Sequence, residues 1–206
     1  ILGQMKTRIL LAFFLFTITW AYGQTPYVVM VSFDGFRYDY AERYNLANFK
    51  KFINEGASAE ALIPSFPSKT FPNHYTLVTG QYPGNHGLVD NEFYDPAQKK
   101  LYKTKDRTMV EDPSFYGGIP LWQLAQQHGM KSASFYWVGS EAKVLGVFPD
   151  YYRLYDVNVK NEERVDQTIN WLKLPEADRP HFISLYFSFV DNEAHTTGPT
   201  SVQTQK

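Results

Sequence analysis

The sequence contains no cysteine among its 206 residues. The protein therefore forms no disulfide bond, offers no thiolate to a metal ion and carries no lipid-modified cysteine. This absence fits export to a bacterial periplasm, or secretion by a bacterium, better than it fits a disulfide-rich animal ectodomain.

The sequence also lacks an excess of charge of either sign. It has 20 Lys and Arg residues against 21 Asp and Glu residues, for a net charge of −1. Proteins that bind nucleic-acid polymers or anionic membranes have a basic surface, so we expect neither partner. An anionic substrate would have to be attracted locally, by metal ions. No repeat, charge block or linker divides the chain, and we expect one domain core.

The N-terminal segment has the three parts of a secretory signal. Residues 5–8 carry positive charge, residues 9–20 are apolar, and residues 21–23 form a small-x-small cleavage site. The alternative is a membrane anchor, but crossing a bilayer takes about 20 apolar residues and this run is shorter. We expect residues 5–23 to be a signal peptide, with no stable membrane anchor after cleavage. Residues 1–4 are interpreted as translated sequence ahead of the true initiator.

Apolar strands and amphipathic helices alternate along the rest of the chain. The run at 27–33 is continuously apolar and rich in β-branched residues, which is typical of a parallel strand buried on both faces. The repeated order predicts an α/β fold with a mainly parallel sheet flanked by helices, with ligands beyond the carboxyl ends of the strands. The predicted strands are 27–33, 57–63, 132–137 and 181–189, and the predicted helices are 46–55, 70–79, 119–128 and 162–174.

Polar side chains follow two of these strands and begin one of these helices. Asp34 and Gly35 follow the first strand, Thr70 begins a helix, and Asp191 follows the last strand with His195 four positions later. Together they suit a hydroxyl nucleophile held over zinc ions. Taken singly, Asp34 and Thr70 are better explained as helix caps or turn residues, and the Asp-His pair as a surface contact. Only their combination favours a catalytic site.

Four specific blocks follow one another along the chain: SFDGFR at 32–37, FPSKTFPNHYTLVTG at 66–80, YPGNHG at 82–87 and DNEFYD at 90–95. These blocks resemble the nucleotide pyrophosphatase/phosphodiesterase family, the type I phosphodiesterases of the alkaline phosphatase superfamily. Weaker similarity at 137–141 and 191–199 extends the resemblance over roughly residues 26–199. It implies that residues 26–206 form part of an alkaline-phosphatase-like catalytic domain.

The resemblance implies a two-zinc mechanism. Thr70 would be the nucleophile, with its alkoxide bound to a zinc ion that Asp34 also holds. Asp191 and His195 would hold the second zinc ion, and Asn91 would donate a hydrogen bond to a non-bridging phosphate oxygen. A phosphothreonine intermediate is expected, which zinc-bound water would hydrolyse.

Two aromatic residues match positions that stack on the nucleotide base in this family. They are Phe71 and Tyr186, and packing in the core explains them equally well. The segment 187–190 reads Phe-Ser-Phe-Val, where many relatives carry acidic residues and a proline, so the substrate pocket differs there. Three histidines outside this set, at 74, 86 and 128, are interpreted as scaffold residues.

The resemblance implies hydrolysis of phosphodiester or pyrophosphate bonds in a nucleotide. A sulfatase would need the pattern C/S-x-P-x-R, whereas the aligned residues 70–74 read Thr-Phe-Pro-Asn-His. A phosphomonoesterase of this branch uses an added cationic pair, and residues 139–141 read Gly-Ser-Glu in the region where it would lie. The family completes its metal sites with an Asp-His pair and a further histidine downstream of this segment. We therefore expect a C-terminally truncated chain that is inactive by itself.

Overall fold

The computed structural model describes residues 25–205. The predicted signal peptide at 5–23 lies outside these residues. Within them, no helix is both long enough and apolar enough to cross a membrane.

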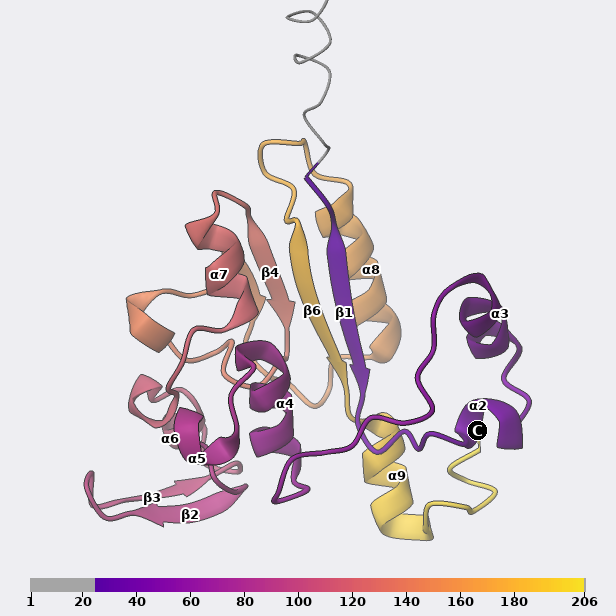
Figure 1. Ribbon diagram of the computed structural model, residues 1–206, viewed down its shortest axis with the longest axis horizontal. Helices are drawn as coiled ribbons and strands as arrows, with labels where there is room; N and C mark the ends of the chain where they lie inside the picture. The colour runs from indigo at the N-terminus through magenta and orange to yellow at the C-terminus, as the bar shows by residue number, and fades with distance from the viewer. Residues whose placement is uncertain (1–24, 206) are drawn as a thin grey trace, which may run out of the picture.

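Four parallel strands form the central sheet. β1 (Val28–Phe33), β6 (Phe182–Phe187), β4 (Ser132–Phe135) and β5 (Tyr151–Arg153) lie side by side in that order. In Figure 1 the arrowheads of β1, β6 and β4 all point to the lower part of the molecule, so their carboxyl ends share one edge. The predicted α/β class with a parallel sheet is confirmed.

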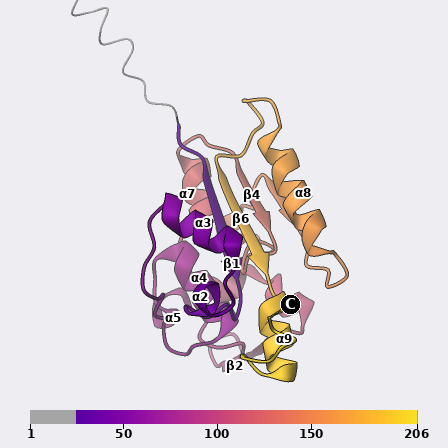
Figure 2. The same cartoon turned by 90° about the vertical axis from the view of Figure 1, so that its right-hand side faces the viewer.

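Helices cover the two faces of this sheet. α7 (Leu121–Gln127) lies on one side and α8 (Asn161–Leu172) on the other, and both contact β4 and β6 (Figure 2). Every residue of β4 and β6 is buried, as expected of strands with neighbours on both faces. Trp122 of α7 and Trp171 of α8 are both buried in this core.

The carboxyl edge of the sheet carries the remaining elements. α4 (Thr70–Thr79) and α9 (Phe189–Thr197) lie near the ends of β1 and β6 (Figure 1). An antiparallel hairpin of β2 (Glu92–Asp95) and β3 (Lys100–Lys103) lies at the periphery. The short elements are α2 (Tyr40–Arg43), α3 (Ala47–Glu55), α5 (Pro83–His86), α6 (Arg107–Val110), η1 (Pro113–Phe115) and η2 (Val144–Gly146).

The predicted strand at 57–63 is wrong. These residues form no strand, and Leu62 and Ile63 are 74% and 88% exposed. A strand needs a neighbour to satisfy its backbone groups, and none lies beside this segment in the described chain. The predicted strand at 181–189 also ends early, because Phe189 begins α9.

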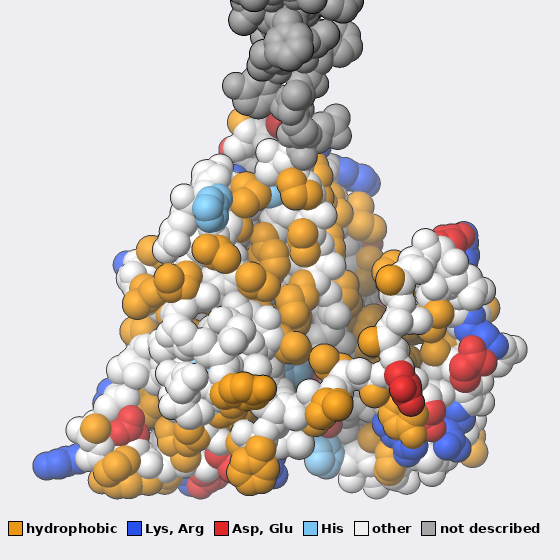
Figure 3. Space-filling view, viewed as in Figure 1, with side chains coloured by type: hydrophobic (Ala, Val, Ile, Leu, Met, Phe, Trp, Pro, Cys, Tyr) orange, Lys and Arg blue, Asp and Glu red, His pale blue; other side chains and the backbone are white. Residues whose placement is uncertain are grey.

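β1 is an edge strand and is not buried on both faces as predicted. It pairs only with β6, and Val28, Val29 and Val31 remain 41–49% exposed. Figure 3 shows hydrophobic side chains gathered on the face over the central strands. The apolar run correctly predicted the strand, but a run cannot distinguish a central strand from an edge strand because both are equally apolar.

Candidate active site

The turn after β1 brings Asp34 to the carboxyl edge of the sheet. The Asp34 amide donates to the Phe187 carbonyl at 2.9 Å, so β1 and β6 stay paired to their ends. Gly35 then adopts φ +69°, and a Cβ at this position would lie 2.8 Å from the Cα of Asp191. Only glycine combines this conformation with this contact, so the turn can pack against the first turn of α9.

The hydroxyl of Thr70 reaches the Asp34 carboxylate. Thr70 is the first residue of α4, and its Oγ1 donates to Asp34 Oδ2 at 3.0 Å. His74, one turn later, lies 2.8 Å from the Thr70 carbonyl through Nδ1 and 2.8 Å from the Ser32 hydroxyl through Nε2. The sequence-predicted pair of Thr70 and Asp34 is therefore brought together, and the positive end of the α4 dipole lies at the threonine.

Tyr186 donates to the same carboxylate. Its hydroxyl lies 2.7 Å from Asp34 Oδ2, and the residue is only 8% exposed. Burial, together with the neighbouring Asp34 charge, raises the pKa of Tyr186, so the phenol keeps its proton at neutral pH. Its ring meets His74 edge to face at 5.0 Å. The stacking of this ring on a base stays a prediction.

Asp191 and His195 are paired on α9. His195 Nε2 lies 3.5 Å from Asp191 Oδ1 across one helical turn, and His195 is exposed. Partial burial raises the pKa of Asp191, and the charge of Asp34 raises it further. The two carboxylates therefore repel each other, which a cation between them would relieve.

The four predicted metal ligands fit zinc in kind. A threonine oxygen, two carboxylates and an imidazole are donors that zinc accepts. Residues 25–205 nevertheless hold no group of three or more His, Cys, Asp or Glu side chains arranged to bind one ion. The described residues therefore hold no complete set of such side chains for one ion. The predicted donors are Asp34, Thr70, Asp191 and His195.

Asn91 lies beside the predicted nucleophile. Its Oδ1 accepts a hydrogen bond from the Phe71 amide at 3.0 Å, directly after Thr70. Within the described residues its Nδ2 donates to no protein acceptor, so this amide has a free donor. The half-buried ring of Phe71 meets Tyr102 edge to face at 6.3 Å.

The three histidines predicted to be scaffold residues have structural contacts. His74 is 6% exposed and His86 is 1% exposed. Burial lowers the pKa of His86 to about 4, and its Nδ1 accepts from the Leu88 amide at 3.2 Å. His128 is the C-cap residue of α7, as expected from its place before Gly129.

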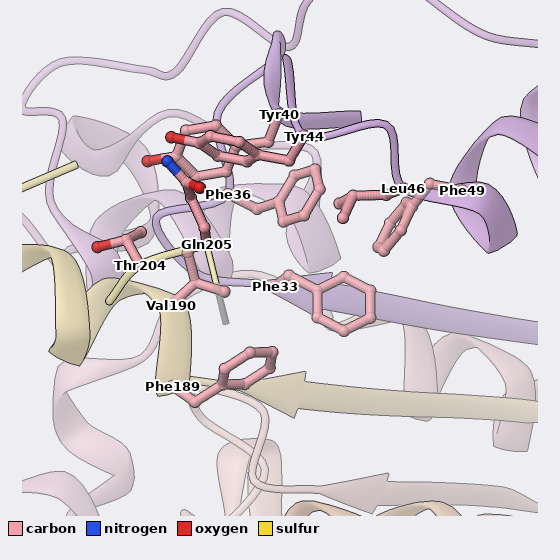
Figure 4. Close-up of a pocket in the computed structure, with 10 residues that line it drawn as sticks. All are labelled: Phe33, Phe36, Tyr40, Tyr44, Leu46, Phe49, Phe189, Val190, Thr204 and Gln205. Carbon is pink, nitrogen blue, oxygen red and sulfur yellow. The ribbon is translucent and has the colours of Figure 1, made fainter. Parts of the chain in front are cut away.

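An aromatic pocket of about 150 Å³ lies next to Asp34 and Asp191 (Figure 4). It was not predicted, because its side chains come from three segments far apart in the sequence. Phe33 and Val190, which directly precede Asp34 and Asp191, contribute to its wall, as does Phe189. The other lining residues are Phe36, Tyr40, Tyr44, Leu46, Phe49, Thr204 and Gln205.

Comparisons with known proteins agree with this architecture. Residues 28–206 match the family described as type I phosphodiesterase / nucleotide pyrophosphatase. Human ectonucleotide pyrophosphatase/phosphodiesterase family member 1 is 39% identical over 185 residues, which cover 89% of this chain and 20% of the relative. A venom phosphodiesterase of Macrovipera lebetinus is 38% identical over 180 residues, covering 86% of this chain and 21% of the relative.

Solved structures show the same likeness. Murine ectonucleotide pyrophosphatase/phosphodiesterase 5 superposes with a TM-score of 0.82 at 34% identity, over 87% of this chain and 48% of that chain. An inactive variant of the murine protein in complex with AMP gives a TM-score of 0.83 at 33% identity, over 87% of this chain and 48% of that chain. The chain spans about a fifth of the length of the curated relatives it matches. It belongs to the type I phosphodiesterase / nucleotide pyrophosphatase family.

Proposed function

We propose that the protein hydrolyses phosphodiester or pyrophosphate bonds of nucleotides, with Thr70 as the nucleophile. The observation that carries this proposal is the 3.0 Å hydrogen bond from Thr70 Oγ1 to Asp34 Oδ2 at the carboxyl edge of the sheet. Ligands of open α/β sheets bind at that edge. The AMP complex of the murine relative supports a nucleotide as the substrate class.

Thr70 attacks the phosphorus atom in the proposed reaction. The bond from Thr70 Oγ1 to phosphorus forms while the bond to the leaving alcohol or phosphate breaks. The Thr70 hydroxyl donates to Asp34 Oδ2, which can take its proton during the attack. The leaving oxygen departs as an anion, and an alkoxide then takes a proton from water. Water then cleaves the phosphothreonine and restores the hydroxyl.

Two zinc ions would complete the site, one held by Asp34 and Thr70 and the other by Asp191 and His195. Bound zinc supplies charge that stabilises the attacking and leaving oxygens. The effect of Asp34 on the pKa of Asp191 supports this assignment, because neighbouring carboxylates are what a cation stabilises. Further ligands are needed for two full shells, so we propose that the 206-residue chain alone binds zinc weakly and turns over little substrate.

Asn91 and Phe71 contact the substrate in this proposal. The Nδ2 of Asn91 donates to one non-bridging phosphate oxygen, while its Oδ1 stays bonded to the Phe71 amide. Phe71 packs against the base. With Asn91 as the one neutral donor for a single oxygen, a diester suits the site better than a dianionic monoester, which is the alternative substrate class of the superfamily.

We also propose that the protein acts outside the cytoplasm, in the periplasm or after secretion. The names of the relatives support this location, since they describe ectoenzymes and a venom enzyme. Export would remove residues 5–23. The N-terminal sequence of the exported protein tests this proposal: it should begin at Gln24.

Trapping the intermediate tests the chemistry. The full-length protein is mixed with a nucleotide labelled on the transferred phosphate and quenched in acid within one turnover. Mass spectrometry should place the label on the peptide that contains Thr70. A label on another residue, or an unlabelled protein during steady turnover, would contradict covalent attack by Thr70.

A further inference from the structure

Two hydroxyl groups converge on one carboxylate oxygen. Asp34 Oδ2 accepts from Tyr186 at 2.7 Å and from Thr70 at 3.0 Å. The three residues come from the end of β1, from β6 and from the start of α4. Among residues 25–205, no hydrogen bond reaches the other oxygen, Oδ1. One oxygen is therefore fixed by protein donors and the other is left for a cation.

The donor from β6 is rigidly held. The Tyr186 carbonyl accepts from Arg164 Nη1 at 3.0 Å, and Arg164 is itself only 4% exposed. The guanidinium also lies over the Phe187 ring at 5.8 Å. The Tyr186 ring also packs edge to face with His74, with the ring centroids 5.0 Å apart. Contacts to both the backbone and the ring therefore place the hydroxyl at Asp34.

We propose that Tyr186 is a positioning residue whose hydroxyl orients the Asp34 carboxylate for Thr70 and for a metal ion. This inference rests on the proposed function. It gives the tyrosine a different role from the base stacking expected from the sequence. A ring that is 8% exposed offers little surface to a base, whereas its hydroxyl already contacts a predicted ligand. Groups that hydrogen-bond a metal ligand typically change metal affinity or activity by about 10–100-fold when they are removed.

Tyr186→Phe separates the two roles, because it removes the hydroxyl and keeps the ring. The matched control is Tyr102→Phe, which removes a buried hydroxyl that bonds Tyr116 at 2.9 Å in the core. Zinc binding is measured by titration calorimetry in the full-length protein. Turnover is measured with a nucleotide diester and with a diester that has no base.

Tyr186→Phe should weaken zinc binding about 10–100-fold and lower kcat equally for both diesters, while Tyr102→Phe leaves both unchanged. Zinc affinity like that of Tyr102→Phe would overturn the proposal. So would a KM effect limited to the nucleotide.

A second measurement, made on proteins that keep Tyr186, decides the proposal if Tyr186→Phe does not fold or if no zinc binds. The Tyr186 hydroxyl proton should give a slowly exchanging, downfield NMR signal in the metal-free chain. Asp34→Asn should move that signal, and Asp90→Asn should not. A signal whose chemical shift is the same in Asp34→Asn would overturn the positioning role. A chain that binds no zinc contradicts the proposed cofactor and leaves this signal to decide the role of Tyr186.

Discussion

The turn at Gly35 and the first turn of α9 are in direct contact: a Cβ on Gly35 would lie 2.8 Å from the Cα of Asp191. This contact places the carboxylate of Asp34 beside that of Asp191. Because the contact is between backbone and backbone, no flexible side chain can move aside to admit a larger residue.

Gly35→Ala should therefore separate the two halves of the candidate site. The matched control is Gly80→Ala, since Gly80 also has a positive φ, of +66°, but has no atom within 4 Å of its Cβ position. Both variants carry the backbone strain of about 1 kcal/mol, and Gly35→Ala should lose roughly 1–3 kcal/mol more, from the clash. Urea unfolding measures the difference. Equal losses would show that the approach of β1 to α9 is not tight.

The buried His86 predicts a loss of stability in mild acid. Burial lowers the folded pKa from 6.5 to about 4, so the folded state binds fewer protons than the unfolded state between these values. Stability is full above about pH 6.5 and falls as the pH drops towards 4, by up to about 3 kcal/mol. Urea unfolding across this range should show the slope. His86→Gln should flatten it, and His128→Gln at the end of α7 should not. If the free energy of unfolding of His86→Gln depends on pH as steeply as that of the unmodified protein, groups other than His86 cause the acid sensitivity.

Zinc binding should depend on both carboxylates. Asp34→Asn and Asp191→Asn should each weaken zinc binding by at least about tenfold, because each removes a charged donor. Asp166→Asn, on the exposed side of α8, is the control and should bind as the unmodified chain does. Titration calorimetry on the 206-residue chain and on the full-length protein gives the affinities. The shorter chain should bind more weakly, and equal binding by all four proteins would remove these carboxylates from the metal site.

The substrate class can be tested with two esters of one leaving group. We expect kcat/KM to favour the phosphodiester over the phosphomonoester, because Asn91 supplies a single neutral donor and no Lys-Arg clamp for a dianion was found in the sequence. Chelation of metal should abolish both activities, and added zinc should restore them. A preference for the monoester would favour the alternative class of phosphatases.

The element predicted most accurately is the one with clear start and stop signals. The helix beginning at Thr70 was placed to the residue, because proline in its first turn and glycine after its end limit it on both sides. The hairpin of β2 and β3 was missed because its strands are short. Its turn does carry a local signal, since the Asp95 carboxylate accepts from the amides of Ala97 and Gln98. The strand predicted at 57–63 does not form, since apolar residues alone do not supply a partner strand.

The candidate site was predictable only in part. Asp34 and Thr70 were expected to meet because the carboxyl ends of parallel strands share an edge. The hydroxyl of Tyr186 on Asp34 was not, because it depends on the register that pairs Ser32 with Tyr186 and on which way the ring turns in the core. The approach of Gly35 to Asp191 likewise depends on how α9 packs, which no local pattern encodes.

Replacement of the nucleophile tests the central claim most directly. Thr70→Ala is compared with Thr79→Ala, which removes a hydroxyl at the other end of α4, where it bonds the Tyr75 carbonyl. In the full-length protein, Thr70→Ala should lower kcat/KM for an aryl phosphodiester by at least about 10³-fold while fold and zinc content are kept, and Thr79→Ala should stay within about tenfold. A Thr70→Ala protein that also stays within tenfold of the unmodified enzyme would contradict the account.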